Sequence, residues 1–226
     1  MTIPNTYNGL VSSLAALAED DSQEFLNYIP TAIFLTEERM FKELDTDGIE
    51  AFTSVTAVAG NPLLAKPTGY RVGLDISYRT SSGIQHVIKR GDDYLRDYWP
   101  VNASSSAHPN GVPKYFADRG PNSFTLAPIP ASAYQFEILH TKPLTHLSAG
   151  NQTNYYTDEC PDALFYGTMS NMCEFLKDYG TQQVWETKYV NAMTAVNNEG
   201  MRARQPGSGI PSDNPRPSEN TLKGTK

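Results

Sequence analysis

The chain has 226 residues, of which 39% are hydrophobic, and a formal net charge of −7 at pH 7. A chain of this length buries roughly 70% of the surface that its unfolded form exposes, so it can build a core without disulfides or metal ions. The acidic balance argues against a protein that holds nucleic acid through clustered Lys and Arg side chains. No stretch approaches the ~20 apolar residues of a membrane-spanning helix, and the N-terminus lacks a signal-peptide pattern.

Two amphipathic patterns near the N-terminus predict two helices. The first has its apolar residues on one face: Leu10, Leu14, Leu17 and Ala18. The second covers residues 22–44, and Ser22 is suited to be its N-cap. Pro30 either kinks this second helix or starts its main segment.

From about residue 50 to 147 the hydrophobic pattern changes to the alternation that indicates strands. The clearest strand has alternating apolar residues: Tyr70, Val72, Leu74, Ile76 and Tyr78. A turn at 80–83 leads into residues 84–89, and these two segments predict a hairpin. The remaining expectations are a short helix at 92–98, an exposed loop at 102–113 and strands at 114–116, 124–126 and 134–139. The pattern thus predicts a small antiparallel β unit between two helical pairs.

Residues 160–197 contain two further amphipathic patterns joined by a break at 178–181. Gly180 is suited to stop the first helix, and Thr181 is suited to cap the second. The apolar faces are formed by Phe165, Met169, Met172, Cys173 and Leu176 and by Trp185, Tyr189, Ala192, Met193 and Val196. A short connection makes the two helices antiparallel neighbours, and their apolar stripe requires a partner from elsewhere in this chain or from another chain. Cys160 and Cys173 are expected to be reduced, buried side chains.

The last segment, residues 205–226, contains four prolines and only two aliphatic anchors, Ile210 and Leu222. It cannot build a core, and we expect it to be disordered when alone. Two interpretations stay open: a frayed terminus, or a peptide that orders on a partner.

The sequence offers no pattern typical of a catalytic or metal site. The four histidines lack the ligand spacing of a zinc site, and residues 45–48 contain only part of a calcium loop. Phosphate-binding Gly-rich loops, nucleophile elbows and zinc-binding HExxH helices are missing from the sequence. We therefore expect no catalytic residue, no bound metal and no cofactor.

The order of motifs along the chain resembles the head-to-tail adaptor proteins of tailed bacteriophages, also called connector or tail-tubular proteins. The resemblance covers about residues 22 to 200. It is carried by Ile29-Pro30, Ala32-Ile33, Glu38-Arg39-Met40, Pro113, Tyr115, residues 124–130, Tyr134, Pro143-Leu144, residues 161–167, Leu176-Lys177-Asp178, Trp185, Tyr189 and Ala192.

This resemblance implies an α+β fold. A four-helix bundle would be made of N- and C-terminal helix pairs, residues 1–49 and 150–204, with an antiparallel β domain, residues 50–149, inserted between them. Residues 205–226 would form a disordered or extended C-terminal arm. The family further implies a ring of copies, usually twelve, in the virion neck between the portal protein and the tail or nozzle protein. Such a ring is assembled in the host cytoplasm, contacts no membrane, and lets DNA pass through without specific binding.

The arm reverses the sign of the acidic body, because five bases outweigh Asp213 and Glu219 between residues 201 and 226. It is therefore expected to be drawn to an acidic surface on the portal. The residues predicted to bind the portal are Arg202, Arg204, Ile210, Pro211, Arg216, Leu222 and Lys223.

Two other functions stay open at this point. One is a small hydrolase whose site lies on the β unit, which three polar groups converging in a closed pocket would favour. The other is a β-rich tail-tip or receptor-binding module, in which the loop at residues 102–111 would recognise the receptor. The second alternative leaves the two flanking helix pairs without a role.

Overall fold

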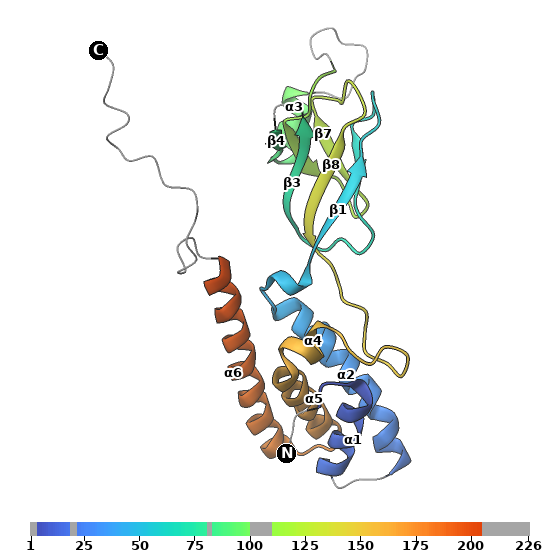
Figure 1. Ribbon diagram of the computed structural model, residues 1–226, viewed down its shortest axis with the longest axis vertical. Helices are drawn as coiled ribbons and strands as arrows, with labels where there is room; N and C mark the ends of the chain where they lie inside the picture. The colour runs from blue at the N-terminus through green and yellow to red at the C-terminus, as the bar shows by residue number, and fades with distance from the viewer. Residues whose placement is uncertain (1–3, 19–21, 81–82, 100–109, 205–226) are drawn as a thin grey trace, which may run out of the picture. The chain divides into compact units, whose positions relative to one another are not determined.

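The computed structural model of the protein describes residues 4–18, 22–80, 83–99 and 110–204 (Figure 1). The chain divides into two compact units, one formed by Met1–Asp47 with Ser148–Lys226 and the other by Gly48–Leu147. We call the first the helical unit and the second the β unit.

The helical unit takes its helices from both ends of the chain (Figure 1). They are α1 (Tyr7–Ala18), α2 (Gln23–Glu43), α4 (Tyr155–Glu159), α5 (Pro161–Phe175) and α6 (Tyr179–Arg204). Ser22 caps α2 as predicted, because its hydroxyl accepts a hydrogen bond from the Phe25 N–H at 3.3 Å. Pro30 lies inside α2, which continues through it.

The N-terminal and C-terminal helices pack together, as the family resemblance implied. α5 contacts both α2 and α6, and α1 contacts α2. The buried side chains at these contacts include Phe25, Ile29, Ile33, Met40, Leu164, Met172, Tyr189 and Met193. Burial of each such side chain contributes about 1.5–3 kcal/mol. This shared core gives most of the predicted apolar stripe of α5 and α6 its partner within the chain, but Leu176 is 44% exposed.

The break between α5 and α6 lies earlier than predicted. α5 ends at Phe175, and Lys177 adopts the left-handed conformation with φ of 60°. The carboxylate of Asp178 accepts a hydrogen bond from the Thr181 N–H at 3.2 Å, which is the bond of an N-cap. The predicted stop at Gly180 and cap at Thr181 are therefore wrong, and Gly180 lies in the first turn of α6.

The β unit consists of two four-stranded sheets and one short helix (Figure 1). The first sheet has the strand order β1 (Glu50–Thr56), β8 (Gln135–Thr141), β3 (Gly73–Thr80) and β4 (Gly83–His86). The second sheet has the strand order β2 (Leu63–Ala65), β7 (Ser123–Ala127), β6 (Tyr115–Asp118) and β5 (Ile88–Lys89). A single-turn 3₁₀ helix (Asp47–Ile49) precedes β1, and α3 (Asp92–Tyr98) is the short helix that the sequence predicted. Side chains of both sheets share one core, including Leu64, Ile76, Phe124, Leu126, Phe136 and Ile138.

Two features of the β unit correct the predicted antiparallel arrangement. The segment 84–89 is not one strand: β4 pairs with β3 in the first sheet, while β5 pairs with β6 of the second sheet and runs parallel to it. Val87 lies between them, buried, where the chain passes from one sheet to the other. The β unit is therefore mixed rather than wholly antiparallel. The β3–β4 hairpin itself is confirmed.

The predicted core face of β3 is confirmed for only part of its length. Ile76 and Tyr78 are buried, but Val72 and Leu74 are 58% and 50% exposed. The pairing of β3 with β8 shifts between Gly73 and Asp75, so Leu74 is an extra residue in a bulge. One inserted residue reverses the faces of the residues before it. Most of the predicted loop at 102–113 lies outside the described residues.

Candidate interaction surfaces

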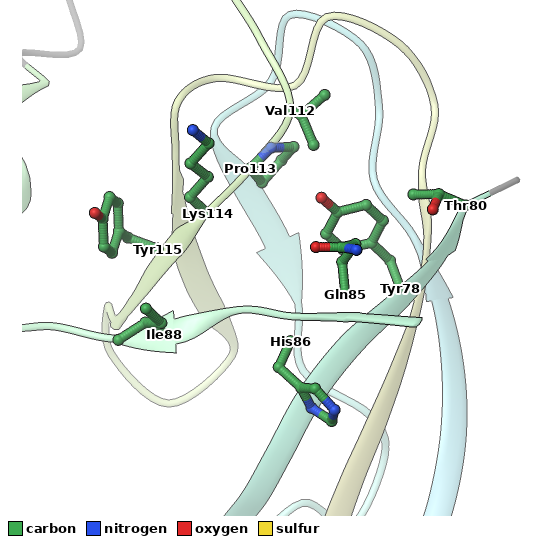
Figure 2. A pocket seen from close by; sticks show the side chains of 9 residues that line it. All are labelled: Tyr78, Thr80, Gln85, His86, Ile88, Val112, Pro113, Lys114 and Tyr115. Atoms are coloured by element: carbon green, nitrogen blue, oxygen red, sulfur yellow. The ribbon is translucent and has the colours of Figure 1, made fainter. Parts of the chain in front are cut away.

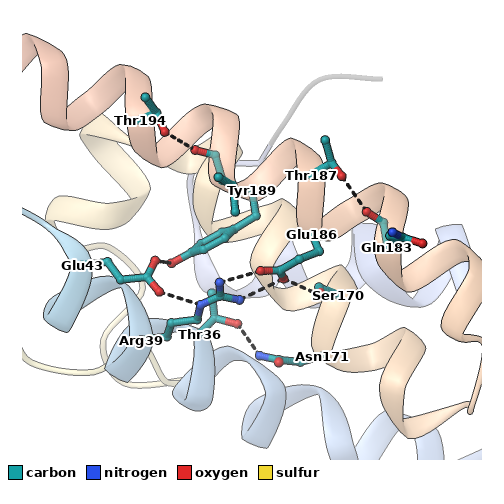
Figure 3. Close-up of polar contacts among 11 residues, drawn as sticks. Thr36, Arg39, Glu43, Ser170, Asn171, Gln183, Glu186, Thr187, Tyr189 and Thr194 are labelled. Carbon is teal, nitrogen blue, oxygen red and sulfur yellow. Dashed lines mark hydrogen bonds and ion pairs between the residues drawn. The ribbon is translucent and has the colours of Figure 1, made fainter.

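A cluster of polar side chains around Arg39 joins three helices of the helical unit (Figure 3). The guanidinium of Arg39 on α2 donates two hydrogen bonds to the carboxylate of Glu186 on α6, at 2.9 and 2.6 Å. It donates another, at 2.9 Å, to Glu43 one turn along α2. Glu43 accepts a hydrogen bond from the Tyr189 hydroxyl at 2.7 Å, and the Ser170 hydroxyl of α5 donates to Glu186 at 3.0 Å. The cluster ties α2, α5 and α6 together.

The pKa shifts in this cluster favour a structural role over a catalytic one. Hydrogen bonding to Arg39 lowers the pKa of Glu186 below its ordinary value. Burial, with the hydrogen bond to Glu43, raises the pKa of Tyr189 above its ordinary value. A general acid or base works best when its pKa lies near the working pH, and both of these shifts lead away from neutrality.

Replacing Glu186 with glutamine is expected to lower the free energy of unfolding at neutral pH by about 1 kcal/mol, because the pair with Arg39 is half-exposed and screened by water. Arg39 lowers the pKa of Glu186 in the folded protein. The stabilisation is therefore complete above the ordinary glutamate pKa of about 4.3 and is lost as the pH falls through the folded value.

Thermal melts of wild type and Glu186→Gln across acidic and neutral pH test this expectation. The difference in stability should shrink as the pH falls below about 4. Glu199→Gln makes the same charge change at an exposed residue of the same helix and serves as the control. A difference that stays constant with pH, or that Glu199→Gln reproduces, would contradict the assignment.

The β unit carries an open groove of about 500 Å³ beside β4 and β5 (Figure 2). It is lined by apolar and aromatic side chains, among them Tyr78, Ile88, Pro113 and Tyr115, and by polar ones such as Gln85 and Lys114. β4 is an edge strand of its sheet, and all four of its residues are exposed. A groove beside an edge strand is suited to an extended chain segment rather than to a small enclosed substrate.

His86 at this groove forms a pair with Asp75. Its Nδ1 lies 2.9 Å from a carboxylate oxygen of Asp75. Ser77 is the register partner of His86 across the β3–β4 hairpin, so the residue types of a hydrolase triad come from two adjacent strands. The His86 side chain is 68% exposed, however, and the neighbouring groove is open to solvent. This open arrangement does not favour the hydrolase alternative, which requires polar groups converging in an enclosed site.

The remaining ligand-type residues do not form a cluster in the part of the chain that the structure describes. There, no three His, Cys, Asp or Glu side chains lie close enough to hold a metal ion. Cys160 and Cys173 are buried free thiols, as predicted. Burial raises the pKa of Cys160 to about 12, which keeps its thiol protonated and poorly reactive. None of the described helices is both long enough and apolar enough to cross a membrane.

The side of α6 that faces away from α2 and α5 is a surface that the sequence did not single out. We call it the outer α6 face and define it by Val184, Thr187, Val190, Asn191, Thr194 and Asn198, all of which are exposed. Lys188 is the one charged residue among the exposed described residues from Tyr179 to Asn198. Its ammonium lies over the Trp185 ring, 4.1 Å from the centroid. Five turns of exposed helix therefore present almost no charge.

Two of the seven predicted portal-binding residues lie at the end of the described chain. Arg202 is exposed in the last turn of α6, and Arg204 is the last residue of that helix. Ile210, Pro211, Arg216, Leu222 and Lys223 lie outside the described residues. Their role stays a prediction.

Comparison with known proteins adds one finding. The model of a protein family described as SU10 adaptor protein matches residues 5–211, which include helices of the helical unit and the whole β unit. No curated protein sequence matches the chain.

Proposed function

Because the chain belongs to the SU10 adaptor protein family, we propose that it is a structural virion protein that forms a ring between the portal and the tail. The observation that carries this proposal is the family match over nearly the whole chain. The ring surrounds the path of the DNA, and each copy contributes one helical unit and one β unit. The protein acts by binding and has no catalytic step.

The charge of the chain supports a channel role. A net charge of −7 per copy gives the ring an acidic surface, and like charges repel the phosphates of DNA. DNA then moves through the ring without being held. The exposed groove of the β unit, lined partly by aromatic side chains, supplies a contact surface for other virion proteins, since enclosed pockets are not needed for assembly.

A receptor-binding module is the second candidate, and the helical unit argues against it. Two helix pairs from opposite ends of the chain pack into one core, and the helical unit that they form accounts for about half of the described residues. A β-rich tip module has no use for them, whereas an adaptor needs a rigid body that can be repeated around an axis.

The isolated protein is expected to be largely monomeric and to form the ring on a portal template. Copies that each carry a charge of −7 repel one another, and a preassembled portal offsets this repulsion by holding many copies at high local concentration. Sedimentation of the purified protein at physiological salt should give a monomer, while class averages of portal-bearing heads incubated with it should show a ring. A stable ring from purified protein alone would contradict the first part, and heads that stay bare would contradict the proposed function.

A further inference from the structure

We infer that the outer α6 face is the surface on which a second copy of this chain packs. The inference rests on the proposed ring. The face consists of six exposed residues of α6: Val184, Thr187, Val190, Asn191, Thr194 and Asn198. Figure 3 shows Thr187 and Thr194 on the side of α6 away from α2 and α5.

The chemistry of this face is that of an interface rather than of a surface held in water. Exposed helix faces normally carry charged residues, and the cores of protein interfaces are depleted of them. Val184 and Val190 are 55% and 47% exposed. The hydroxyls of Thr187 and Thr194 donate to the carbonyls of Gln183 and Val190 one turn earlier, at 2.9 and 2.7 Å.

These internal hydrogen bonds matter because they leave the threonine methyl groups as the outward part of the side chain. A partner that covers Thr187 and Thr194 does not leave their hydroxyl groups without an acceptor, since each hydroxyl proton is already bonded to a carbonyl of the same helix. The desolvation cost of covering these two threonines is therefore small.

Charge identifies a second copy as the occupant. The chain is strongly acidic, so two copies can approach closely only where their surfaces carry no like charges, and the outer α6 face meets that condition. Nucleic acid would require clustered bases, which this face lacks. The segment 205–226, with three bases and two acids, would find no opposite charges here.

The size of the face fits a contact that is weak in one pair and strong in a closed ring. Twenty residues of helix form a strip about 30 Å long and about 10 Å wide. Such a strip covers less than half of the ~800 Å² per partner that a stable dimer buries. In a ring each copy meets two neighbours, and the contacts reinforce one another once a template has gathered the copies.

The first test adds charge to the face while reducing the net negative charge of the chain. Thr187→Lys with Thr194→Lys should melt like wild type, because both residues are exposed. Its occupancy on portal-bearing heads should fall by at least about tenfold, since each contact would bury an unpaired ammonium. The matched control is Ser12→Lys with Ala16→Lys on α1, where both residues are exposed and the Ser12 hydroxyl also donates to the preceding turn, at 2.8 Å.

The control should keep wild-type occupancy within about twofold. Wild-type occupancy by the α6 variant, or an equal loss in both variants, would overturn the inference. If wild type itself does not join the heads, the proposed function fails, and the contact between copies is then judged by cross-linking alone.

Cross-linking detects the contact between the outer α6 face and a second copy without adding charge to that face. Thr194→Cys, labelled with a thiol-reactive photo-cross-linker, should give covalent dimers in rings and in concentrated protein, while labelled Ala16→Cys should not. The native Cys160 and Cys173 are buried and escape labelling. Cross-links confined to residues 205–226 or to the β unit of the same chain would show another occupant and overturn the inference.

Discussion

Replacing Gly167 with valine is expected to lower the free energy of unfolding of the helical unit by about 3 kcal/mol, the upper part of the range for overpacked cores. A Cβ atom at this position of α5 would lie 2.7 Å from Cγ2 of Thr36 and 2.8 Å from a ring carbon of Tyr189. Both neighbours are fully buried, one on α2 and the other on α6. Neither side chain can yield, so α5 would have to move away from both helices and open the core.

The matched control is Gly180→Val in the first turn of α6. A Cβ atom there would have Asp178 as its nearest neighbour, at 3.7 Å, which is an ordinary contact. Valine has a slightly higher helix propensity than glycine, so this variant should stay within about 1 kcal/mol of wild type. The helical circular dichroism signal followed on heating measures both. Equal melting of the two variants would mean that the three helices do not approach as closely at Gly167 as the structure places them.

The sequence predicted the helices well because their apolar residues repeat with the helical period over many turns. Phe165, Met169 and Met172 are buried as expected, and so is Tyr189 on α6. The boundary between α5 and α6 was predicted less accurately. Glycine usually takes the left-handed position that ends a helix, so Gly180 was the natural choice, but Lys177 takes it here. Which residue takes the left-handed position depends on how both helices pack. Nothing in the local sequence singles out Lys177 for it.

In the β unit the hairpin was predictable and the assembly of the sheets was not. The alternation up to Tyr78 and the turn at 80–83 are local signals, and the β3–β4 pair follows them. The bulge at Leu74 depends on the partner strand β8, which lies about sixty residues further along the chain. The passage from the first sheet to the second at Val87 likewise depends on where β6 lies. Pairings of this kind are tertiary, so a single sequence does not fix them.

The candidate surfaces divide in the same way. The predicted portal-binding residues were chosen from charge and proline content, both of which can be read directly from a sequence. The cluster around Arg39 joins residues 147 positions apart, and nothing in the sequence selects Glu186 among twenty-five acids. A signal for the outer α6 face did exist, namely threonine, valine and asparagine where an exposed helix face normally carries charge. Its meaning depended on knowing which side of α6 faces the core.

Truncation of the chain after Ala203 is expected to leave folding nearly unchanged and to abolish stable attachment to portal-bearing heads. The buried apolar residues of the described chain end at Met193, so neither core needs the segment that is removed. Ile210 and Leu222 could each contribute about 1–2 kcal/mol if they are buried on the portal. Loss of both corresponds to roughly a 30-fold to 1,000-fold weaker affinity.

Full-length variants separate the two contributions of this arm. Ile210→Ser with Leu222→Ser keeps every charge and should reduce occupancy on heads almost as far as truncation does. Arg216→Gln with Lys223→Gln keeps the apolar anchors and should mainly slow attachment and weaken its dependence on salt, because charges at the edge of an interface act on the rate of encounter. Melting curves of all three chains should overlay that of wild type. If the truncated chain still fills the heads at wild-type occupancy, residues 204–226 are a loose end and the helical unit must carry the attachment.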